Sequence, residues 1–515
     1  MVEPFWLFRD PLMKQLFIIT AILFLSGCGG SSSNNEPNPD PTPQPEPEMT
    51  NEHLSGGDTS VADSSADAFS SRSNNMTDTS RIATFELGDD FFQNPWVAGS
   101  ASTSSRDGLG GLFNNNACQD CHIRDGRGHA PNEGSTDFNS ILFRAARTQI
   151  SHAQQAQMLN SSLANVPDSA VGGQLQQAAV AGVLPEVELS VTYEERVVTF
   201  ADGYQVSLRD PKWHFINLHE AQGHYFDEDT LFSARVAPPM IGLGLLALIA
   251  ETDILAKQDI NDSNGDGISG KANYVWSINN QDVALGRFGW KAGQPSLLEQ
   301  SAGAFLNDMG LTSRLHQNES CLSHQTDCQQ TPNGNGDSVN DYDYEVSDTV
   351  LDAIALYSHH LSVPQRQNAY DDDVKRGKAL FITLGCQQCH TESYTTEYSA
   401  EHPELSAQKI FPYTDMLLHD MGEDLADFTR ANTPGSNENL YEFLATATEW
   451  RTPPLWGLGK TKTVDPDATF LHDGRARTIM EAVLWHGGEA ETSKQKVLAL
   501  NASEREDLLA FLNDL

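Results

Sequence analysis

The chain has few basic residues for its length. It carries 32 Lys and Arg against 71 Asp and Glu, a formal net charge of −39 at pH 7 over 515 residues. Proteins that bind nucleic acid neutralise phosphates with clustered Lys and Arg, so this charge argues against a nucleic acid partner. The acidity suits a solvated surface, and it would also attract a basic electron-donor protein.

Apolar runs of membrane-spanning length are also lacking. The apolar run 16–25 follows Lys14, but a spanning helix needs about 20 apolar residues. A short apolar run behind a positive residue is typical of a secretory signal peptide. We therefore interpret residues 1–27 as a signal peptide, with Met13 as a candidate start, and a simple anchor helix is the alternative.

Cys28 makes this interpretation more specific. Leu25-Ser26-Gly27-Cys28 resembles the lipobox of bacterial lipoproteins, in which the cysteine is lipidated and becomes the mature N-terminus. We expect the protein on the periplasmic side of a bacterial membrane or at the cell surface, held to the membrane through the lipid anchor only. Gly29 and Gly30, rather than an acidic residue, follow Cys28, which favours the outer membrane over the inner one.

The segment behind Cys28 has a biased composition. Residues 29 to about 80 are rich in Ser, Asn, Pro, Asp and Glu, and proline alternates with other residues from Pro37 to Pro47. Such a composition is typical of a linker. We predict a disordered tether over residues 28–80.

Cysteine is scarce, and most of it falls into one repeated motif. The sequence Cys-x-x-Cys-His occurs twice among only seven cysteines. It is the attachment signature of c-type haem, whereas a dithiol or half a zinc site is the alternative for a bare Cys-x-x-Cys. We predict two covalently bound haem c groups, with the histidines as iron ligands. The residues are Cys118, Cys121, His122, Cys386, Cys389 and His390.

Two further cysteines, Cys321 and Cys328, lie in a polar stretch seven residues apart. In an oxidising compartment such a pair favours a local disulfide. A metal-binding role is the alternative.

The haem motifs divide the chain into two halves. We predict an N-terminal haem c domain over 81–365, with an insertion at about 130–230 that has some β structure, and a C-terminal cytochrome c domain over 366–515. Helices are expected over 347–361, after Asp371 and after Ser503. A glycine and an aromatic residue before the second motif, answered by an apolar C-terminal helix, resemble class I cytochrome c. The predicted fold is therefore mainly α, with two such domains in tandem.

The two halves also share sequence beyond the haem motifs. Residues 235–244 match 451–459 with one gap, and both contain a Pro-Pro pair followed by Gly-Leu-Gly. Downstream, Phe, Ser or Thr, and Glu recur at equal spacing, as Phe288, Ser296 and Glu299 and as Phe470, Thr478 and Glu481. Ser or Thr followed three residues later by Glu is a capping box that opens a helix. This order indicates duplication of a cytochrome c domain.

A candidate calcium loop lies between the repeats. Asp262, Asn264 and Asp266 alternate, followed by a glycine and by Ile268, whose carbonyl would be a further ligand. Oxygen ligands at alternate positions suit Ca²⁺, but position 12 is Asn273 rather than Glu, so this is not a full EF-hand. An Asp/Asn/Gly turn is the alternative.

Together these motifs resemble a known family. The chain is similar over about 85–515 to the bacterial di-haem oxidoreductases, also called thiol oxidoreductase-like or peroxidase-like proteins, which are related to the di-haem cytochrome c peroxidases and the MauG group. The segments that carry the resemblance are the two haem motifs and residues 286–292, 451–459, 470–476 and 484–490.

The resemblance implies roles for particular residues. In di-haem peroxidases the N-terminal haem reduces hydrogen peroxide and the C-terminal haem takes in electrons. It implies that Gln300 and Asp308 hold and protonate peroxide, since breaking the O–O bond requires a proton transfer, and that Trp290 relays electrons. Asp308 departs from the Glu that is usual two residues later in the family.

The distal ligands depart from the family as well. Leu471 stands where the peroxidases have a Met ligand, so His472, Met416 and Met421 are candidate ligands of the C-terminal haem, and an open site is the alternative. No His falls just before Arg235, where the family's removable distal His would be expected, which implies a five-coordinate N-terminal haem at rest.

The expected function is therefore that of a peroxidase-like enzyme. Electrons from a donor protein or quinol chain would pass through the C-terminal haem to hydrogen peroxide, or another small oxidant, at the N-terminal haem. A non-enzymatic electron-transfer cytochrome, or MauG-like oxidation of a protein or metal substrate, is the alternative.

Overall fold

The structure is a computed structural model that describes residues 51–99, 101–334 and 344–515. These residues belong to one compact unit, Thr50–Leu515. The predicted signal peptide and Cys28 lie outside the described residues, and so does the tether as far as residue 50. None of the helices in the described ranges has the length and apolar character that would let it cross a bilayer.

Helices in the described residues are mostly short and are joined by long irregular segments. Their bounds are α1 Thr79–Gln93, α2 Cys118–Cys121, α3 His152–Leu159, α4 Leu243–Ala247, α5 Glu251–Leu255, α6 Leu297–Met309, α7 Asp348–His360, α8 Asp372–Leu384, α9 Thr461–Val464, α10 Ile479–Trp485, α11 Glu491–Leu498 and α12 Ala502–Asp514.

Short strands accompany them. Their bounds are β1 Val97–Ala98, β2 Asp107–Leu109, β3 Leu112–Phe113, β4 Ile141–Arg147, β5 Ala178–Ala179, β6 Val187–Thr199, β7 Gln205–Asn217, β8 Thr230–Val236, β9 Tyr274–Ser277, β10 Asp282–Leu285, β11 Tyr394–Thr395, β12 Lys409–Ile410, β13 Leu418–Asp420, β14 Phe428–Thr429, β15 Leu440–Glu442, β16 Ala445–Thr446 and β17 Glu449–Arg451. Apart from the three-stranded β14-β8-β4 sheet, the sheets of the described chain are strand pairs. The prediction of a mainly α fold is therefore confirmed only in part.

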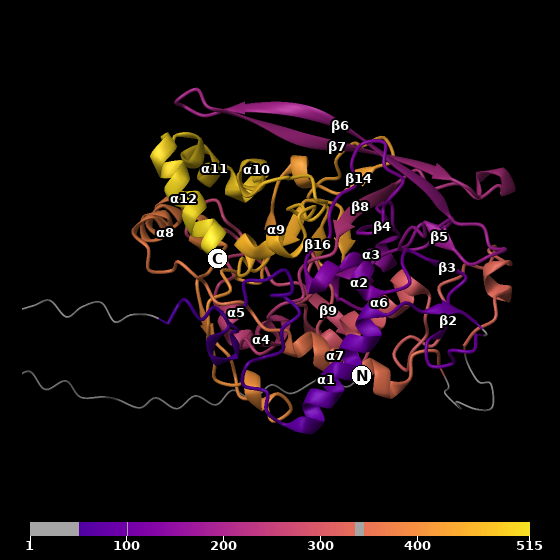
Figure 1. Cartoon of the computed structure of the whole chain (residues 1–515). Coiled ribbons are helices and arrows are strands. Elements are labelled where there is room, and N and C mark those ends of the chain that lie inside the picture. The colour runs from indigo at the N-terminus through magenta and orange to yellow at the C-terminus, as the bar shows by residue number, and fades with distance from the viewer. Residues whose placement is uncertain (1–50, 100, 335–343) are drawn as a thin grey trace, which may run out of the picture. The chain divides into compact units, whose positions relative to one another are not determined.

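Two pairs of helices, α8 with α12 and α1 with α7, lie side by side (Figure 1). A Cβ atom at Gly377 of α8 would lie 2.0 Å from the Asp507 carbonyl of α12, and one at Gly88 of α1 would lie 2.4 Å from the Ala353 carbonyl of α7. Glycine therefore permits both close crossings. The α8–α12 crossing agrees with the class I cytochrome c prediction, whereas α1 and its crossing in the first half were not predicted.

Polar side chains cap the helix starts. The Ser347 hydroxyl accepts a hydrogen bond from the Val350 amide at the start of α7, as the expected helix requires. The C-terminal helix begins earlier than predicted, because Asn501 and Glu504, rather than Ser503 and Glu506, form its capping box.

The predicted insertion supplies most of the long strands. β4 pairs with β8 over seven residues, and β14 from the C-terminal half adds to β8. In agreement with the β structure expected there, the long strand β6 pairs with β7 as a hairpin (Figure 1). Phe200 and Leu208 of this hairpin pack in the apolar core of the C-terminal half with Phe511. The insertion therefore ties the two halves together.

The halves share further apolar cores. Phe69, Ile241 and Val363 pack in one core with Trp456 from the C-terminal half. Trp450 packs with strands of the N-terminal half in another. The halves are thus parts of one unit rather than separate bodies, although each keeps its own helix crossing.

Residues 51–80 correct the predicted tether. Ala68, Phe69 and Met76 are buried, and the Val61 amide donates to the Val363 carbonyl. Apolar side chains scattered through a polar segment can fill gaps in a neighbouring core, which average composition does not reveal. The prediction of disorder is therefore wrong for this stretch.

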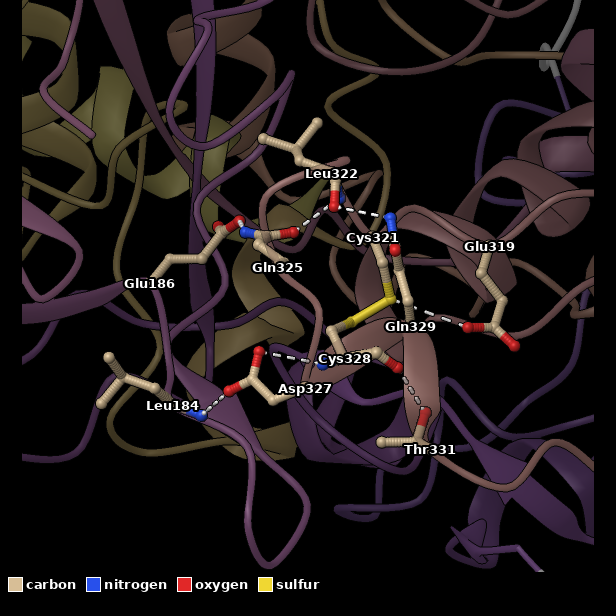
Figure 2. Close-up of a disulfide and its surroundings, with 10 residues drawn as sticks. All are labelled: Leu184, Glu186, Glu319, Cys321, Leu322, Gln325, Asp327, Cys328, Gln329 and Thr331. Atoms are coloured by element: carbon tan, nitrogen blue, oxygen red, sulfur yellow. Dashed lines mark hydrogen bonds between the residues drawn. A yellow bond between two sulfur atoms is a disulfide. The ribbon is translucent and has the colours of Figure 1, made fainter. Parts of the chain in front are cut away.

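The Cys321–Cys328 disulfide is confirmed (Figure 2). Gln325, inside the closed loop, donates to the Glu186 carboxylate at 2.6 Å, and Asp327 accepts from the Leu184 amide at 3.1 Å. Burial raises the pKa of Glu186 to about 8. The small loop is thereby fixed against the segment that leads into β6.

Candidate active site

A cavity of about 770 Å³ reaches both Cys-x-x-Cys-His motifs. All six motif residues line it, and the four cysteines are free of disulfides. Burial raises the thiol pKa of Cys121 and of Cys386 to about 12. Neutral thiols of this kind do not suit nucleophilic dithiol chemistry, which requires the thiolate.

The two motif histidines are held in the same way. His122 donates from Nδ1 to the Pro238 carbonyl at 2.8 Å, and His390 donates from Nδ1 to the Tyr413 carbonyl at 2.9 Å. Burial lowers the pKa of each to about 4, so both imidazoles are neutral. With Nδ1 occupied, Nε2 is the nitrogen that is available to bind a metal, an orientation typical of iron-binding histidines.

Helix α6 presents a polar face to the cavity beside the first motif. Gln300, Ala304 and Asp308 line the cavity at intervals of four residues, which places them on one face of the helix. Burial raises the pKa of Asp308, and Gln174 donates to its carboxylate at 2.8 Å. The structure thus brings together Gln300 and Asp308, as expected, whereas Gln174 was not predicted.

Three of the aromatic rings that line the cavity contact one another. The His472 ring stacks on Trp450 with centroids 3.6 Å apart and meets Trp290 at 6.5 Å. Trp290 donates from its indole nitrogen to the Val236 carbonyl at 2.9 Å. Burial lowers the pKa of His472 to about 3, so its ring is uncharged.

The loops that carry these rings are related. In one loop Phe288 forms an isolated antiparallel β-bridge with Gln294, and in the other Phe470 forms the same kind of β-bridge with Ala476. Each loop is hydrogen-bonded to the opposite half of the chain. The Arg451 amide donates to the backbone carbonyl of Trp290, and the Val236 amide donates to the backbone carbonyl of His472. Trp290 and His472 therefore occupy corresponding positions, in agreement with the internal repeat.

A protein-family model described as "Di-haem oxidoreductase, putative peroxidase" matches residues 49–515. The chain belongs to this di-haem oxidoreductase family. No curated protein matches the chain. The family implies two haem groups, and the two Cys-x-x-Cys-His motifs with their oriented histidines fit one haem each.

Arginines around the cavity fit the carboxylate groups of haem. Arg127, Arg144, Arg235 and Arg451 all line it. Burial lowers the pKa of Arg127 and of Arg451 to about 10, which leaves both charged at neutral pH. Charged guanidinium groups are well suited to binding the propionates. Arg124, a second arginine beside the first motif, instead contacts Asp67 at 3.5 Å.

The candidate distal ligands of the C-terminal haem are placed differently from one another. Met416 is buried outside the cavity lining, with its sulfur 3.8 Å from Arg451. Met421 and His472 line the cavity. So does His486, which was not predicted as a ligand. The only signal for His486 in the sequence was its place in the family-like segment 484–490.

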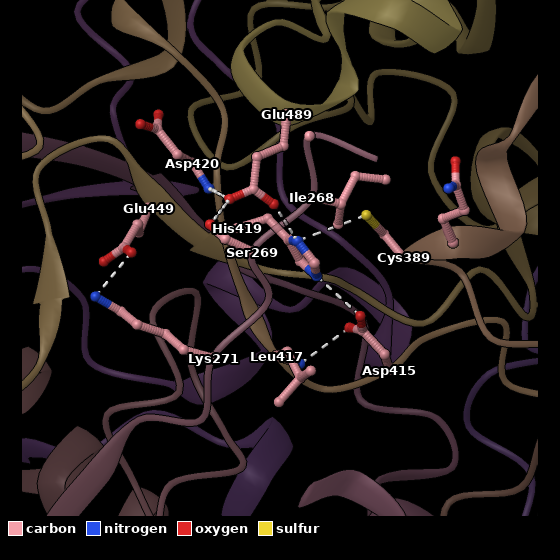
Figure 3. A network of polar contacts seen from close by, with 12 residues as sticks. Ile268, Ser269, Lys271, Cys389, Asp415, Leu417, His419, Asp420, Glu449 and Glu489 are labelled. Carbon is pink, nitrogen blue, oxygen red and sulfur yellow. Dashed lines mark hydrogen bonds and ion pairs between the residues drawn. The ribbon is translucent and has the colours of Figure 1, made fainter. Parts of the chain in front are cut away.

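A buried network adjoins the second motif (Figure 3). His419 bonds through Nε2 to Asp415 at 2.8 Å and through Nδ1 to Glu489 at 2.6 Å. The Cys389 sulfur lies 3.6 Å from its Nδ1. Burial opposes protonation of His419, but Asp415, Cys389 and Glu489 outweigh it and raise its pKa well above the usual value. These groups come from distant segments, so sequence reasoning missed them.

The candidate calcium loop packs against this region. Asp262, Asn264 and Asp266 accept hydrogen bonds from backbone amides of the same loop, and Gln388 of the second haem motif donates to Asp266 at 3.0 Å. Among the described residues, no three His, Cys, Asp or Glu side chains are grouped so that they could hold a metal ion. Calcium binding by this loop and Ile268 therefore stays a prediction, and the turn interpretation agrees with the contacts.

Proposed function

We propose that this di-haem oxidoreductase is a peroxidase-like enzyme with two covalently attached haem c groups. Electrons from a donor protein or quinol chain pass by way of the C-terminal haem to hydrogen peroxide at the N-terminal haem. When bound, the haems supply iron centres that exchange single electrons and, where a coordination position is open, reduce peroxide. The observation that carries the proposal is the polar face of α6, which borders the cavity beside the first motif.

Asp308 is suited to move the proton that peroxide reduction requires. Its raised pKa keeps the carboxyl partly protonated nearer to neutral pH than an ordinary aspartate. Gln174 fixes one carboxylate oxygen, and the Asn114 and Asn115 amides both donate to the Asp308 backbone carbonyl. Gln300, two helical turns earlier on the same face, supplies an amide that can hold the bound oxidant.

The aromatic group offers a route for electrons between the two ends of the cavity. Trp450, His472 and Trp290 are in sequential ring contact, and Arg127 lies 5.3 Å above the Trp290 ring. This geometry supports the relay expected for Trp290 and extends it to two further rings.

The electron donor and the cellular location that we propose rest on the sequence alone. The net charge of −39 favours a basic donor protein, and the Cys28 lipobox favours a lipid-anchored protein of the periplasmic side, most readily at the outer membrane.

Stopped-flow spectroscopy tests the proposal. The haem-loaded protein is reduced by one electron, stoichiometric hydrogen peroxide is added, and the haem bands are followed. We expect rapid reoxidation that slows about 100-fold or more in Asp308→Asn and Gln300→Ala, since general acid catalysis contributes roughly 10²–10⁴-fold. Exposed Asp282→Asn is the matched control and should react like the parent. Absence of reaction in the parent, with both haems low-spin, would leave an electron carrier instead.

A further inference from the structure

Helices α6 and α10 begin in the same way. Each follows one of the two corresponding loops, and each starts at a hydroxyl cap, because Ser296 accepts from the Glu299 amide and Thr478 accepts from the Glu481 amide. Counting from these caps, each residue of α6 has a defined partner in α10 and the segment behind it. The two helices can therefore be compared position by position.

Both helices turn the same positions toward the cavity. The paired lining residues are Leu297 with Ile479, Gln300 with Ala482, Ser301 with Val483, Ala304 with His486, and Asp308 with Ala490. The chemistry on the two faces is reversed. Where α6 has polar Gln300 and Asp308 around a small Ala304, the α10 segment has alanines around an imidazole. The position that Ala304 occupies on the first face is thus filled by a potential iron ligand on the second.

His486 is oriented like the two motif histidines. It donates from Nδ1 to the Ala482 carbonyl at 2.7 Å, which leaves Nε2 as the ligand atom. It is the C-cap residue of α10, so the helix ends where the imidazole meets the cavity. Burial lowers its pKa, and an uncharged imidazole is the form that binds iron.

His486 also lies within electrostatic range of His390. Burial is the main cause that lowers the pKa of His390, and His486 lowers it further. The two imidazoles come from separate elements, one from the haem motif and the other from the end of α10, and both border the same cavity.

Other side chains near the second motif are less suitable as ligands. Both ring nitrogens of His419 are engaged with carboxylates. The His472 ring is stacked on Trp450, and Met416 lies outside the cavity lining. Met421 remains as a lining residue, and its thioether is the main competitor.

We propose that His486 would serve with His390 as a second histidine ligand of the C-terminal haem iron, and that Ala304 would supply no ligand at the corresponding position beside the first motif. The inference rests on the two haems of the proposed function but not on the reaction with peroxide. Because the axial ligands set the potential of a haem, a bis-histidine centre would hold the C-terminal haem in an electron-transferring role without binding an oxidant.

Spectra of the ferric holoprotein test this ligation without any peroxide. Electron paramagnetic resonance and near-infrared magnetic circular dichroism distinguish bis-histidine from histidine–methionine low-spin haem. The parent protein should show one bis-histidine haem. In His486→Ala this signal should be lost, with half of the total haem becoming high-spin, and added imidazole should restore it. Imidazole rescue would not follow if His486 were merely structural.

Two further variants keep the test decisive. His486→Met should replace the bis-histidine signature with a histidine–methionine signature, which guards against a misfolded alanine variant. Met421→Leu should leave the signal intact. The proposal is overturned if the bis-histidine or other low-spin signal survives in folded His486→Ala, or if Met421→Leu removes it. If the parent protein shows the bis-histidine spectrum but does not react with peroxide, that result counts against the proposed function alone.

Discussion

The two halves of the molecule use one scaffold for two different haem environments. Each has a glycine-mediated helix crossing, a motif histidine tied to a backbone carbonyl, and a capped helix after a bridged loop. They differ in the side chains that α6 and α10 direct into the cavity. Under the proposed function, a few substitutions on this shared backbone would make one half an oxidant-binding site and the other an electron-transferring site.

Introducing into α6 the histidine that the second half carries at the end of α10 should have the largest effect on peroxide reduction. Ala304→His places an imidazole on α6 at the position that corresponds to His486. We expect a second low-spin haem and a peroxide reaction at least about 100-fold slower, because the open position and its acid catalysis are lost together. Stopped-flow and ferric spectra measure both. Ala304→Ser is the control, and full reactivity in Ala304→His would show that α6 does not border the oxidant.

The pH dependence of peroxide reduction should follow the protonation of Asp308, the proposed proton donor of the N-terminal half. Burial raises the pKa of Asp308, although Gln174 and Arg144 oppose the rise. Since the protonated form is the donor, the rate should be constant below this pKa and fall about tenfold per pH unit above it. Asp308→Asn should flatten the profile. A parent rate that instead rises with pH would contradict the assignment.

The helix crossings should differ in their tolerance of one methyl group. Gly377→Ala brings Cβ to 2.0 Å from a backbone carbonyl, against 2.4 Å for Gly88→Ala. Overpacking of this kind should lower the free energy of unfolding by roughly 3 kcal/mol in the C-terminal crossing and about 2 kcal/mol in the other. Chemical denaturation of the holoproteins measures both, with exposed Ala379→Gly in α8 as a control for helix propensity. Equal or reversed losses would refute the ranking.

Removing the disulfide should have a small effect on stability, no larger than that of Gly88→Ala, and should act on the N-terminal half. Cys321→Ser with Cys328→Ser frees a short loop, and the chain-entropy account gives a loss of about 2 kcal/mol. The C-terminal haem spectrum should not change. Hydrogen exchange around residues 184–186 and 319–331 would localise the loss. A change in the C-terminal haem instead would mean that the loop acts across the halves.

Many elements could be predicted because they are encoded by neighbouring residues. The helix 348–360 follows from apolar spacing and the Ser347 cap, and the disulfide follows from two cysteines close in sequence. The order of residues 51–80 could not be predicted, because Phe69 is buried by side chains from both halves of the chain. The β6–β7 hairpin was predicted only in part, since its packing against the C-terminal core joins residues about 300 positions apart along the chain.

The sequence by itself determined the haem motifs, their two histidines and the internal repeat, because each motif lies within five consecutive residues and reports its chemistry directly. The resemblance to the family singled out Gln300 and Asp308, and the structure then placed both on one face of α6. Only the tertiary structure decided that the two motifs share one cavity, that Trp450 and His472 stack beside Trp290, and that His486 rather than Met416 borders the second haem site. These arrangements join segments that are far apart in sequence, and burial and hydrogen bonding bring them together only after folding.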